Sequence, residues 1–444
     1  MTVAFPVLTR DFDTSLVVAG WVLNSYQLVA TIMAPLAGKI SDVVGRKPAF
    51  MVYTILFTAG SMASALAPNI YLLIGFRVLQ GIGGGGFMPC AAGVVSEEFP
   101  EARQRYIGLF SSIFPIGMMI GPNLGGWMVD SFGWRSIFWL NVPIGIVILA
   151  LSQWLLSTGK REQTGSSIDF TGAALLFGSL LTLMLGLTQI GNSSSDIPWL
   201  LVGGLTAAGI GTMVAFVWQE QRAREPIVDL ELLKSRPFLA ANIYNIIYGL
   251  TTLGTSSLLP LYAVSIYKMT IFESGVILTP RAVGTIVASV ITSISIMNWG
   301  YRRPILIGTL IAAFSLFLLS LQIQGVEVVG FHIGATPLLL IILGLIGIGH
   351  GICTPASNNA CIELMPEKVA TITGLRGMFR QLGVVVSVAI GTVLLHNIGD
   401  VRRAFFIVLF GSALILLISI PLIFIMPRSP NIRPPGLTSP GVSS

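Results

Sequence analysis

Apolar stretches of about 20 residues recur along nearly the whole chain, and this pattern restricts the possible folds more than any other feature. A helix of that length is long enough to cross a bilayer. Only 10% of the 444 residues are charged, whereas about 25% are charged in a typical soluble domain. The sequence therefore predicts an all-α polytopic membrane protein and excludes a soluble enzyme with a buried core.

We expect about 14 spans of about 20 residues each. The first is a remnant that ends at Leu8. The other expected spans are residues 17–37, 49–66, 70–95, 106–129, 136–156, 170–190, 198–218, 239–263, 274–296, 304–323, 336–361, 370–396 and 404–426. The tail from Pro427 holds five prolines in 18 residues and is expected to be disordered.

The segment Gly38–Lys47 is the first polar break between two long apolar stretches. It contains Lys39, Arg46 and Lys47 together with Asp42. Because cationic loops between spans favour the cytoplasmic side, we expect this turn to lie inside the cell. With that orientation the inner loops and tail hold 16 cations, and the outer loops hold five, namely Arg10, Arg135, Lys268, Arg402 and Arg403.

The remaining composition excludes two classes of function. The net charge of +6 is spread over short loops, so no basic cluster predicts binding to nucleic acid. Cys90, Cys353 and Cys361 have no metal-ligand spacing and imply no disulfide framework. We therefore expect neither a metal nor another cofactor, and no enzymatic site.

The sequence contains an internal repeat. Shifting it by 266 positions aligns 12 identical residues over 45 positions, from Gly81 with Gly347 to Gly125 with Gly391. Nearer the start the shift is 255, and Gly45 meets Gly300. Parallel repeats of this kind relate the two halves of many transporters, with the substrate site between them. Because residues 170–218 have no counterpart, we expect an inserted helix pair. The predicted units are residues 1–160, a linker at 161–235, residues 236–427 and the tail 428–444.

Two cations lie well inside predicted spans. Arg77 shares a helix face with Gly81, and burial at its depth costs about 2.5 kcal/mol or more unless the charge faces a partner or a wet cavity. It is therefore either functional or a snorkelling or structurally paired arginine. Arg281, after Pro280, would attract an anionic substrate or pair with an acid, or it would solvate itself where the proline opens the helix.

Several polar side chains inside the spans are candidates for a substrate cavity. Each is alternatively a hydrogen-bonding link between helices. They are Asn24, Gln27, Asn242, Asn245, Tyr248, Asn358 and Asn359. His350 is a further candidate for a titrating group. The glycines at 117, 121 and 125 form one smooth face, which helix packing alone would also explain.

Three of these patterns resemble the major facilitator superfamily. Gly38, Asp42, Gly45, Arg46 and Lys47 resemble its loop signature between the second and third helices, which implies a charge relay at the cytoplasmic gate. Arg77, Gln80 and Gly81 resemble the fourth-helix motif whose arginine is linked to proton transfer. The string that contains Gly117, Gly121, Pro122, Gly125 and Gly126 resembles the antiporter signature of drug-exporting branches and implies a hinge. The second half departs from the loop signature, because Met297 replaces the acid.

Other strings resemble the 14-span drug:proton antiporters in particular. They are Trp134–Gly145, Asp169–Gly172 and Arg380–Gly383, although Asp169 is equally a plain helix cap. The resemblance implies a major facilitator fold with two six-helix bundles plus two linker helices. It also implies efflux of amphipathic or cationic drugs from the cell by alternating access. The proton gradient would be the energy source, and the partners would be the bilayer, protons and a small molecule, with no nucleic acid and no adaptor protein indicated.

Two expectations qualify this interpretation. No Asp or Glu lies deep in a predicted span, and Val3–Pro6 resembles the second half of the family's first helix. The resemblance therefore implies that the first helix is truncated and that its acid would fall before Met1. Either the natural protein starts further upstream, or this form lacks the usual proton carrier. A specific metabolite or siderophore transporter, or a non-transporting sensor, remains an alternative on the same fold.

Overall fold

The computed structural model describes residues 2–98, 117, 120–156, 169–192, 198–223, 226, 234–328, 331–364 and 369–428. Within these ranges the chain is almost entirely helical. Eleven helices are long and apolar enough to cross a membrane. Large apolar side chains such as Trp154 and Leu200 point outward, at 84% and 93% exposure, as expected for a surface that faces lipid.

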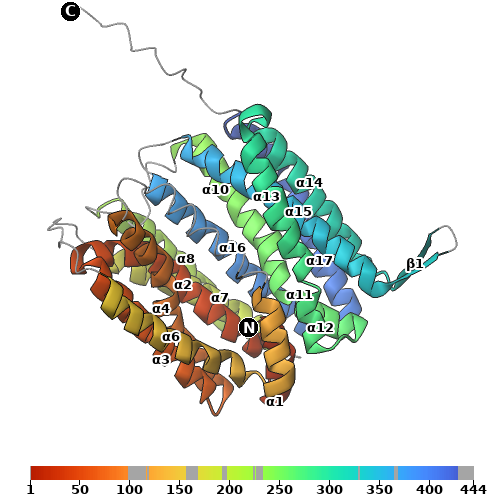
Figure 1. The fold of residues 1–444 in the computed structure, drawn as a ribbon, viewed down its shortest axis with the longest axis horizontal. Helices are drawn as coiled ribbons and strands as arrows, with labels where there is room; N and C mark the ends of the chain where they lie inside the picture. The colour runs from red at the N-terminus through yellow and green to blue at the C-terminus, as the bar shows by residue number, and fades with distance from the viewer. Residues whose placement is uncertain are drawn as a thin grey trace, which may run out of the picture.

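The first half of the chain forms one group of helices (Figure 1). Its elements are η1 (Thr2–Ala4), α1 (Phe5–Asp11), α2 (Leu16–Val44), α3 (Arg46–Ala65), α4 (Ile70–Glu98), a helical segment at 120–132, and α6 (Arg135–Leu155). Helix α4 lies between α2 and α3, and α3 also packs against α6. Glycines permit these close approaches; a Cβ added at Gly83 would lie 2.4 Å from the backbone nitrogen of Phe57.

The second half forms a corresponding group. Its elements are α10 (Arg236–Tyr248), the π-helical turn η2 (Gly249–Gly254), α11 (Thr255–Tyr267), α12 (Ile271–Val276), α13 (Thr279–Trp299), α14 (Arg302–Ser320), α15 (Ala335–Ile362), α16 (Val369–Asn397), α17 (Val401–Ile418) and α18 (Ile420–Ile425). Helix α15 packs between α13 and α14, and α16 packs against α10 and η2.

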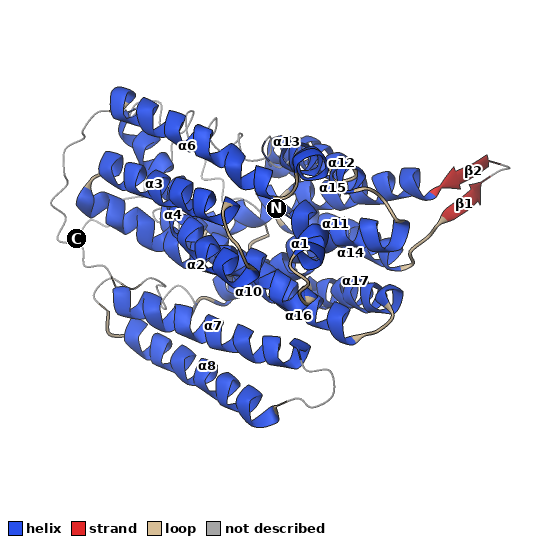
Figure 2. Cartoon of the chain, turned by 90° about the horizontal axis from the view of Figure 1, so that it is seen from below, coloured by secondary structure: helices blue, strands red, loops and turns tan. Residues whose placement is uncertain are grey.

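Two helices, α7 (Phe170–Asn192) and α8 (Trp199–Glu220), form a separate antiparallel pair at the side of the molecule (Figure 2). Helix α7 contacts α2 from one half and α16 from the other. The indole of Trp21 donates a hydrogen bond to Thr188 Oγ1 at 2.7 Å, and Asn397 donates one to the carbonyl of Ile190 at 3.0 Å. The pair is therefore attached to both halves.

Most predicted spans match observed helices, but three expectations were incomplete or wrong. The turn expected over Gly38–Lys47 is helical as far as Val44 and is broken only at Gly45, where φ is +103° and a glycine is favoured. The connection between the predicted spans 304–323 and 336–361 contains an antiparallel hairpin, β1 (Gly325–Val328) and β2 (Phe331–Gly334). The predicted span 239–263 contains the π-helical turn. The count of 14 spans is not confirmed, since most of 106–129 lies outside the described residues.

Candidate functional site

The first polar cluster surrounds Arg77 in the middle of the first half. Arg77 is 6% exposed; its Nε donates to the carbonyl of Val22 at 3.0 Å, and its Nη1 donates to Gln80 Oε1. Gln80 in turn donates to Ser61 Oγ at 2.5 Å. The guanidinium also lies 4.1 Å from the centre of the Tyr26 ring. Neighbouring groups therefore hold this buried cation firmly, by hydrogen bonds and a cation–π contact.

Helices α2 and α4 pack tightly against each other beside this cluster. A Cβ added at Gly81 would lie 2.9 Å from the carbonyl oxygen of Tyr26, so α4 packs directly on α2. Of the predicted cavity residues in this half, Asn24 is buried, and its Oδ1 accepts no hydrogen bond from any described group. Gln27 is half-buried, and its carbonyl accepts from Thr31 within α2.

The predicted gate motif lies at the junction of α2 and α3. The environment of Gly38 and the side chain of Asp42 lie outside the described part of the structure. Lys47 Nζ donates to the carbonyls of Gln153 and Leu156, at 3.0 and 2.7 Å, and so ties α3 to the end of α6. A cation at the C-terminus of a helix is favourable because that end carries partial negative charge.

The second half has an equivalent tether at the repeat-related position. Arg302, which is 255 positions after Lys47, donates from Nε to the carbonyl of Met426 at 2.8 Å, just beyond α18. Beside it, Tyr301 donates to Glu363 Oε2 at 3.1 Å. Burial and the Glu363 carboxylate raise the pKa of Tyr301 to about 12.

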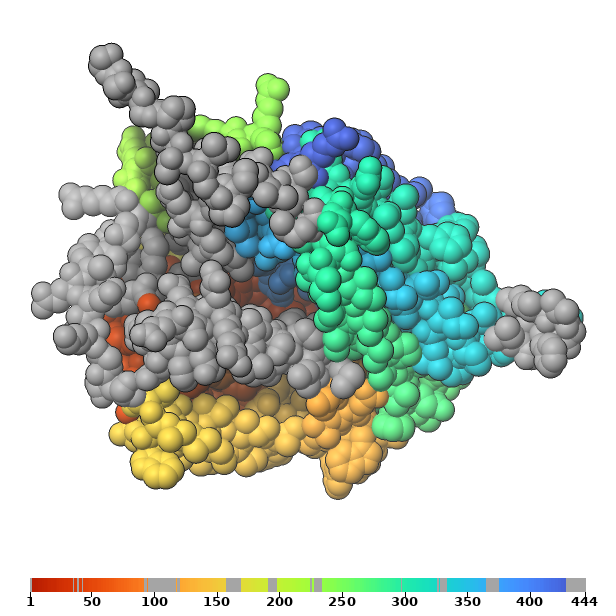
Figure 3. Space-filling view, turned by 45° about the horizontal axis from the view of Figure 1, so that its top comes forward, coloured from red at the N-terminus to blue at the C-terminus, as the bar shows by residue number. Residues whose placement is uncertain are grey.

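The two halves also meet at the opposite end of the bundle. Figure 3 shows the orange segment around 120–134 meeting green residues near 270–290 on this face. A Cβ added at Gly275 would lie 2.3 Å from the carbonyl oxygen of Pro122, and one at Gly126 would lie 3.2 Å from the carbonyl oxygen of Ile271. Asn123 is hydrogen-bonded to Thr279 across the seam, with Nδ2 to Oγ1 at 2.7 Å.

The predicted hinge residues fall into two groups at this seam. Pro122 and Gly126 contact the second half directly. Gly125 faces Val3, at 3.5 Å from an added Cβ. At Gly117 and Gly121 an added Cβ meets no described atom within 4 Å, so the close approach here depends on Gly126 and Gly275. The hinge role of the whole string stays a prediction.

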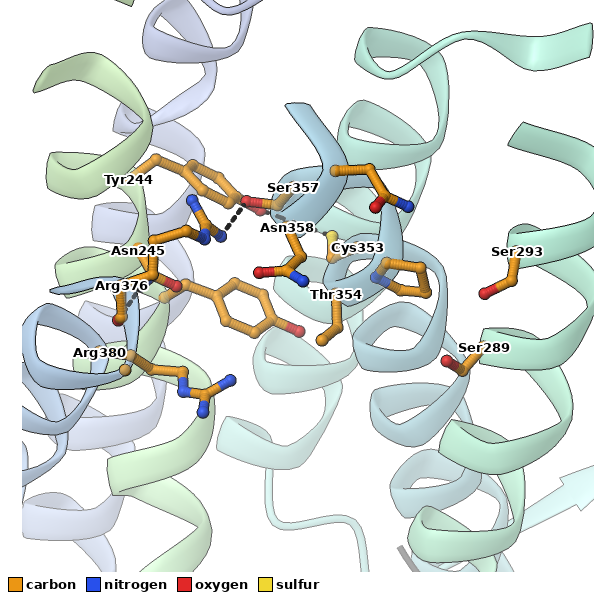
Figure 4. A pocket seen from close by; sticks show the side chains of 14 residues that line it. Tyr244, Asn245, Ser289, Ser293, Cys353, Thr354, Ser357, Asn358, Arg376 and Arg380 are labelled. Atoms are coloured by element: carbon orange, nitrogen blue, oxygen red, sulfur yellow. Dashed lines mark hydrogen bonds between the residues drawn. The ribbon is translucent and has the colours of Figure 1, made fainter. Parts of the chain in front are cut away.

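A cavity of about 430 Å³ lies between α10, α13, α15 and α16. Figure 4 shows its polar and aromatic side chains converging from these helices. It is lined by Tyr244, Asn245, Tyr248, Ser289, Ser293, Cys353, Thr354, Pro355, Ser357, Asn358, Asn359, Arg376, Gly377 and Arg380. The lining residues lie at the end of α10, in the first half of α16 and toward the ends of α13 and α15, which is the predicted inner half of the spans.

Arg376 and Arg380 are one helical turn apart on α16 and bring two cations to this cavity. Arg376 is 6% exposed and donates to Ser357 Oγ at 2.8 Å and to Cys361 Sγ at 3.0 Å. Its carbonyl accepts from Asn245 Nδ2 at 2.5 Å. The backbone at Arg380 is held by Gly249, where an added Cβ would lie 2.1 Å from the Arg380 carbonyl oxygen.

A third cation approaches the same place from α13. Arg281 is 8% exposed, and its Nε has no hydrogen-bond partner among the residues that the structure describes. Both Arg281 and Arg380 interact electrostatically with Tyr248 and His350. The Tyr248 hydroxyl and His350 Nδ1 are 3.1 Å apart. These groups therefore form one connected polar region beside and behind the cavity wall.

The sequence found part of this site. Asn245 and Tyr248 line the cavity with Asn358 and Asn359, whereas Asn242 donates to the carbonyl of Phe238 within α10 and does not line it. The cavity roles of Arg376 and Arg380 were missed. Their depth in a predicted span was an available signal, since charges within spans mark wet or paired sites.

Asp169 lies outside this region and acts as a helix cap. Its Oδ1 accepts from the backbone nitrogen of Gly172 at 2.8 Å, in the first turn of α7. Gln219 Nε2 donates to the same oxygen at 3.2 Å, which links the start of α7 to the end of α8.

Known proteins resemble this chain over most of its length. Multidrug transporter protein MdtP of Bacillus subtilis (strain 168) is 30% identical over 385 residues, which are 86% of this chain and 69% of MdtP. Multidrug resistance protein 3 of the same organism is 31% identical over 84% of this chain and 72% of its own length. The Tetracenomycin C resistance and export protein of Streptomyces glaucescens is 28% identical over 90% of this chain and 73% of its own length.

Solved structures show the same fold at low sequence identity. An auto inhibited POT family peptide transporter aligns with a TM-score of 0.66 at 14% identity, covering 98% of this chain and 95% of the transporter. The nucleoside transporter NupG aligns with a TM-score of 0.65 at 12% identity, covering 95% and 94%. The family model of the Major Facilitator Superfamily matches residues 1–321 and 241–441. The chain therefore belongs to the Major Facilitator Superfamily and is a multi-pass membrane transport protein, not an enzyme.

Proposed function

We propose that this protein exports amphipathic compounds by alternating access, driven by the proton gradient. The observation that carries the proposal is the cavity of about 430 Å³ with polar and aromatic walls inside a bundle that is otherwise apolar. Small-molecule sites typically have volumes of about 300–1,000 Å³. The names of the relatives, which include multidrug transporter and resistance and export protein, support efflux as the direction.

The moving units are residues 1–160 and 236–427, with 161–235 as the linker and 428–444 as the tail. Their described contacts at the Gly126–Gly275 seam are short and rely on glycine. Rocking of one bundle against the other around a central site is the usual mode of such folds. The tethers of Lys47 and Arg302 hold helices within one half each, so they leave movement between the halves free.

Arg77 is the proposed electrostatic partner for proton transfer. Its described hydrogen-bond acceptors, the Val22 carbonyl and Gln80, are neutral, so its charge is available to act on an acid elsewhere. A nearby cation favours the ionised form of a carboxyl group. Proton release to one side would therefore become easier when such an acid approaches Arg77.

Transport in everted membrane vesicles tests this function. Vesicles that contain the protein should accumulate at least one of two amphipathic dyes, one neutral and one anionic, when a proton gradient is imposed, and an uncoupler should abolish the accumulation. Vesicles prepared in the same way from cells that lack the protein serve as the matched control. Accumulation that persists after the uncoupler would contradict proton coupling, and no accumulation in either sample would contradict export.

A specific metabolite or siderophore transporter is the second candidate. The polar lining, with Asn358 and Thr354 extending into the cavity (Figure 4), favours a substrate that accepts and donates hydrogen bonds. Growth assays against a panel of drugs and iron-chelating compounds separate the two, since a specific transporter should protect against one chemical group only.

A further inference from the structure

The cavity of the second half gathers more positive charge than its described walls neutralise. Arg376 and Arg380 lie in the lining, and Arg281 of α13 interacts electrostatically with Tyr248. The described hydrogen-bond acceptors of the Arg376 guanidinium, Ser357 Oγ and Cys361 Sγ, are both neutral. Figure 4 shows the Arg380 guanidinium extending from α16 toward the open space.

No acid balances these charges in the part of the chain that the structure describes. None of the 14 lining residues is an aspartate or a glutamate. The described acid nearest along α15 is Glu363, which lies beyond the end of the helix and accepts from Tyr301. Buried guanidinium groups without a counter-charge are costly at membrane depth. Within the described part of the chain, the charge of these arginines is therefore offset only when an anion or water enters the cavity.

We infer that this cavity binds the anionic head of an amphipathic organic compound, such as a carboxylate, sulfonate or phosphate group. The inference rests on the proposed function, because it names the charge of the exported substrate. Arginine suits this task, since its planar fork binds such groups through two parallel hydrogen bonds. Arg380 presents its fork to the open space, and Arg376, one turn away on α16 and bonded to Ser357 and Cys361, adds a second positive charge to the lining. Tyr244 and Tyr248 contribute aromatic rings to the same lining.

The same charges exclude the opposite class. A cationic compound entering the cavity would meet Arg376 and Arg380 with no described acid to offset their repulsion, and like charges close together cost several kcal/mol in a poorly solvated site. The inference therefore narrows the substrates from amphipathic or cationic compounds to amphipathic anions.

Equilibrium binding to the purified full chain in non-ionic detergent tests the inference. Three ligands on one naphthalene scaffold differ only in charge: a carboxylate, its methyl ester and the corresponding primary amine. Calorimetric titration should show the carboxylate binding about tenfold or more tightly than the ester, as expected for hydrogen bonds to charged groups. The amine should bind more weakly than the ester.

Two variants locate the effect. Arg380→Gln should remove the preference for the carboxylate while leaving the affinity for the ester unchanged, which also reports that the cavity is folded. The matched control is Arg303→Gln, at an exposed arginine of α14, and it should keep the full preference. Equal binding of carboxylate and ester, tighter binding of the amine, or a preference that survives Arg380→Gln would each overturn the inference.

A lipid headgroup is the other source of such an anion. The titration is therefore repeated in nanodiscs of phosphatidylcholine with and without phosphatidylglycerol. Unchanged carboxylate affinity supports a substrate site, and loss of carboxylate binding on adding phosphatidylglycerol would assign the cavity to lipid and overturn the inference. Export of the neutral dye without any charge preference would defeat this inference alone. Selective carboxylate binding without vesicle transport would defeat the proposed function alone.

Discussion

The two halves of the molecule treat buried arginine differently, although they are related by a repeat. In the first half Arg77 is surrounded by the Val22 carbonyl, Gln80 and the Tyr26 ring. In the second half Arg376 and Arg380 line an open cavity, and Arg281 interacts electrostatically with Tyr248 of the same lining. The first arrangement satisfies its cation from within the protein, and the second requires something to enter.

The repeat shows where this difference arises. With the shift of 266, Leu343 stands where the first half has Arg77; with the shift of 255, Arg281 stands where it has Tyr26. Conversely, Arg376 and Arg380 correspond to Phe110 and Phe114. Repeat-related positions of the sequence thus exchange cationic for apolar or aromatic residues, and the exchange accompanies the different surroundings of the described arginines.

The largest expected effect compares two repeat-related glycines, Gly383 and Gly117. A Cβ at Gly383 would lie 2.1 Å from the Ile246 carbonyl oxygen, whereas one at Gly117 meets no described atom within 4 Å. Gly383→Val should therefore prevent folding, because overpacking a backbone contact costs about 1–3 kcal/mol or more. Size-exclusion chromatography in detergent would measure this.

Gly117→Val serves as the control and should give a folded, monodisperse protein. If the hinge prediction is correct, this variant loses vesicle transport while retaining its fold. A folded Gly383→Val protein would contradict the packing of α16 against α10.

The next effect concerns stability at the two sets of arginines. Arg77→Leu, which copies Leu343, should lower the unfolding free energy by about 1–3 kcal/mol, because Gln80 and the Val22 carbonyl lose their donor. Arg380→Leu should instead raise it by about 1 kcal/mol, since it removes a costly buried charge. Thermal unfolding of the two purified variants shows whether each substitution raises or lowers stability. A loss of stability in both variants would contradict the proposed difference between the halves.

The smallest expected effect concerns the tether that both halves contain, made by Lys47 in the first half and by Arg302 in the second. Lys47→Gln and Arg302→Gln should each lower the unfolding free energy by about 0.5–1 kcal/mol, because each breaks a charge-assisted bond to a helix end. Arg303→Gln, at an exposed site, should change it by less than about 0.5 kcal/mol. Chemical unfolding monitored by tryptophan fluorescence would detect this; unequal losses for Lys47 and Arg302 would show that the tethers are not equivalent.

Span positions were largely predictable because apolar length alone fixes them. Residues 170–190, for example, became Phe170–Asn192, and the break at Gly45 follows from its positive φ. The depth of Arg376 and Arg380 was equally readable from the sequence. What spacing cannot give is the rotation of α16 about its axis, which decides whether those arginines face lipid, another helix or a cavity. That rotation is set by contacts such as Gly383 with Ile246.

The π-helical turn Gly249–Gly254 has a consequence for the cavity wall. Such a turn accommodates one residue more than an α-helical turn, and one residue of an α-helix corresponds to about 100° of rotation. The extra residue therefore sets the rotation, about the helix axis, of Tyr248 before the turn relative to Leu258 after it. If the turn relaxed to α-helix and passed its surplus residue along, the tyrosine would swing out of the cavity while α11 kept its packing. Rotation of the α10 segment about its own axis would then open or close the cavity.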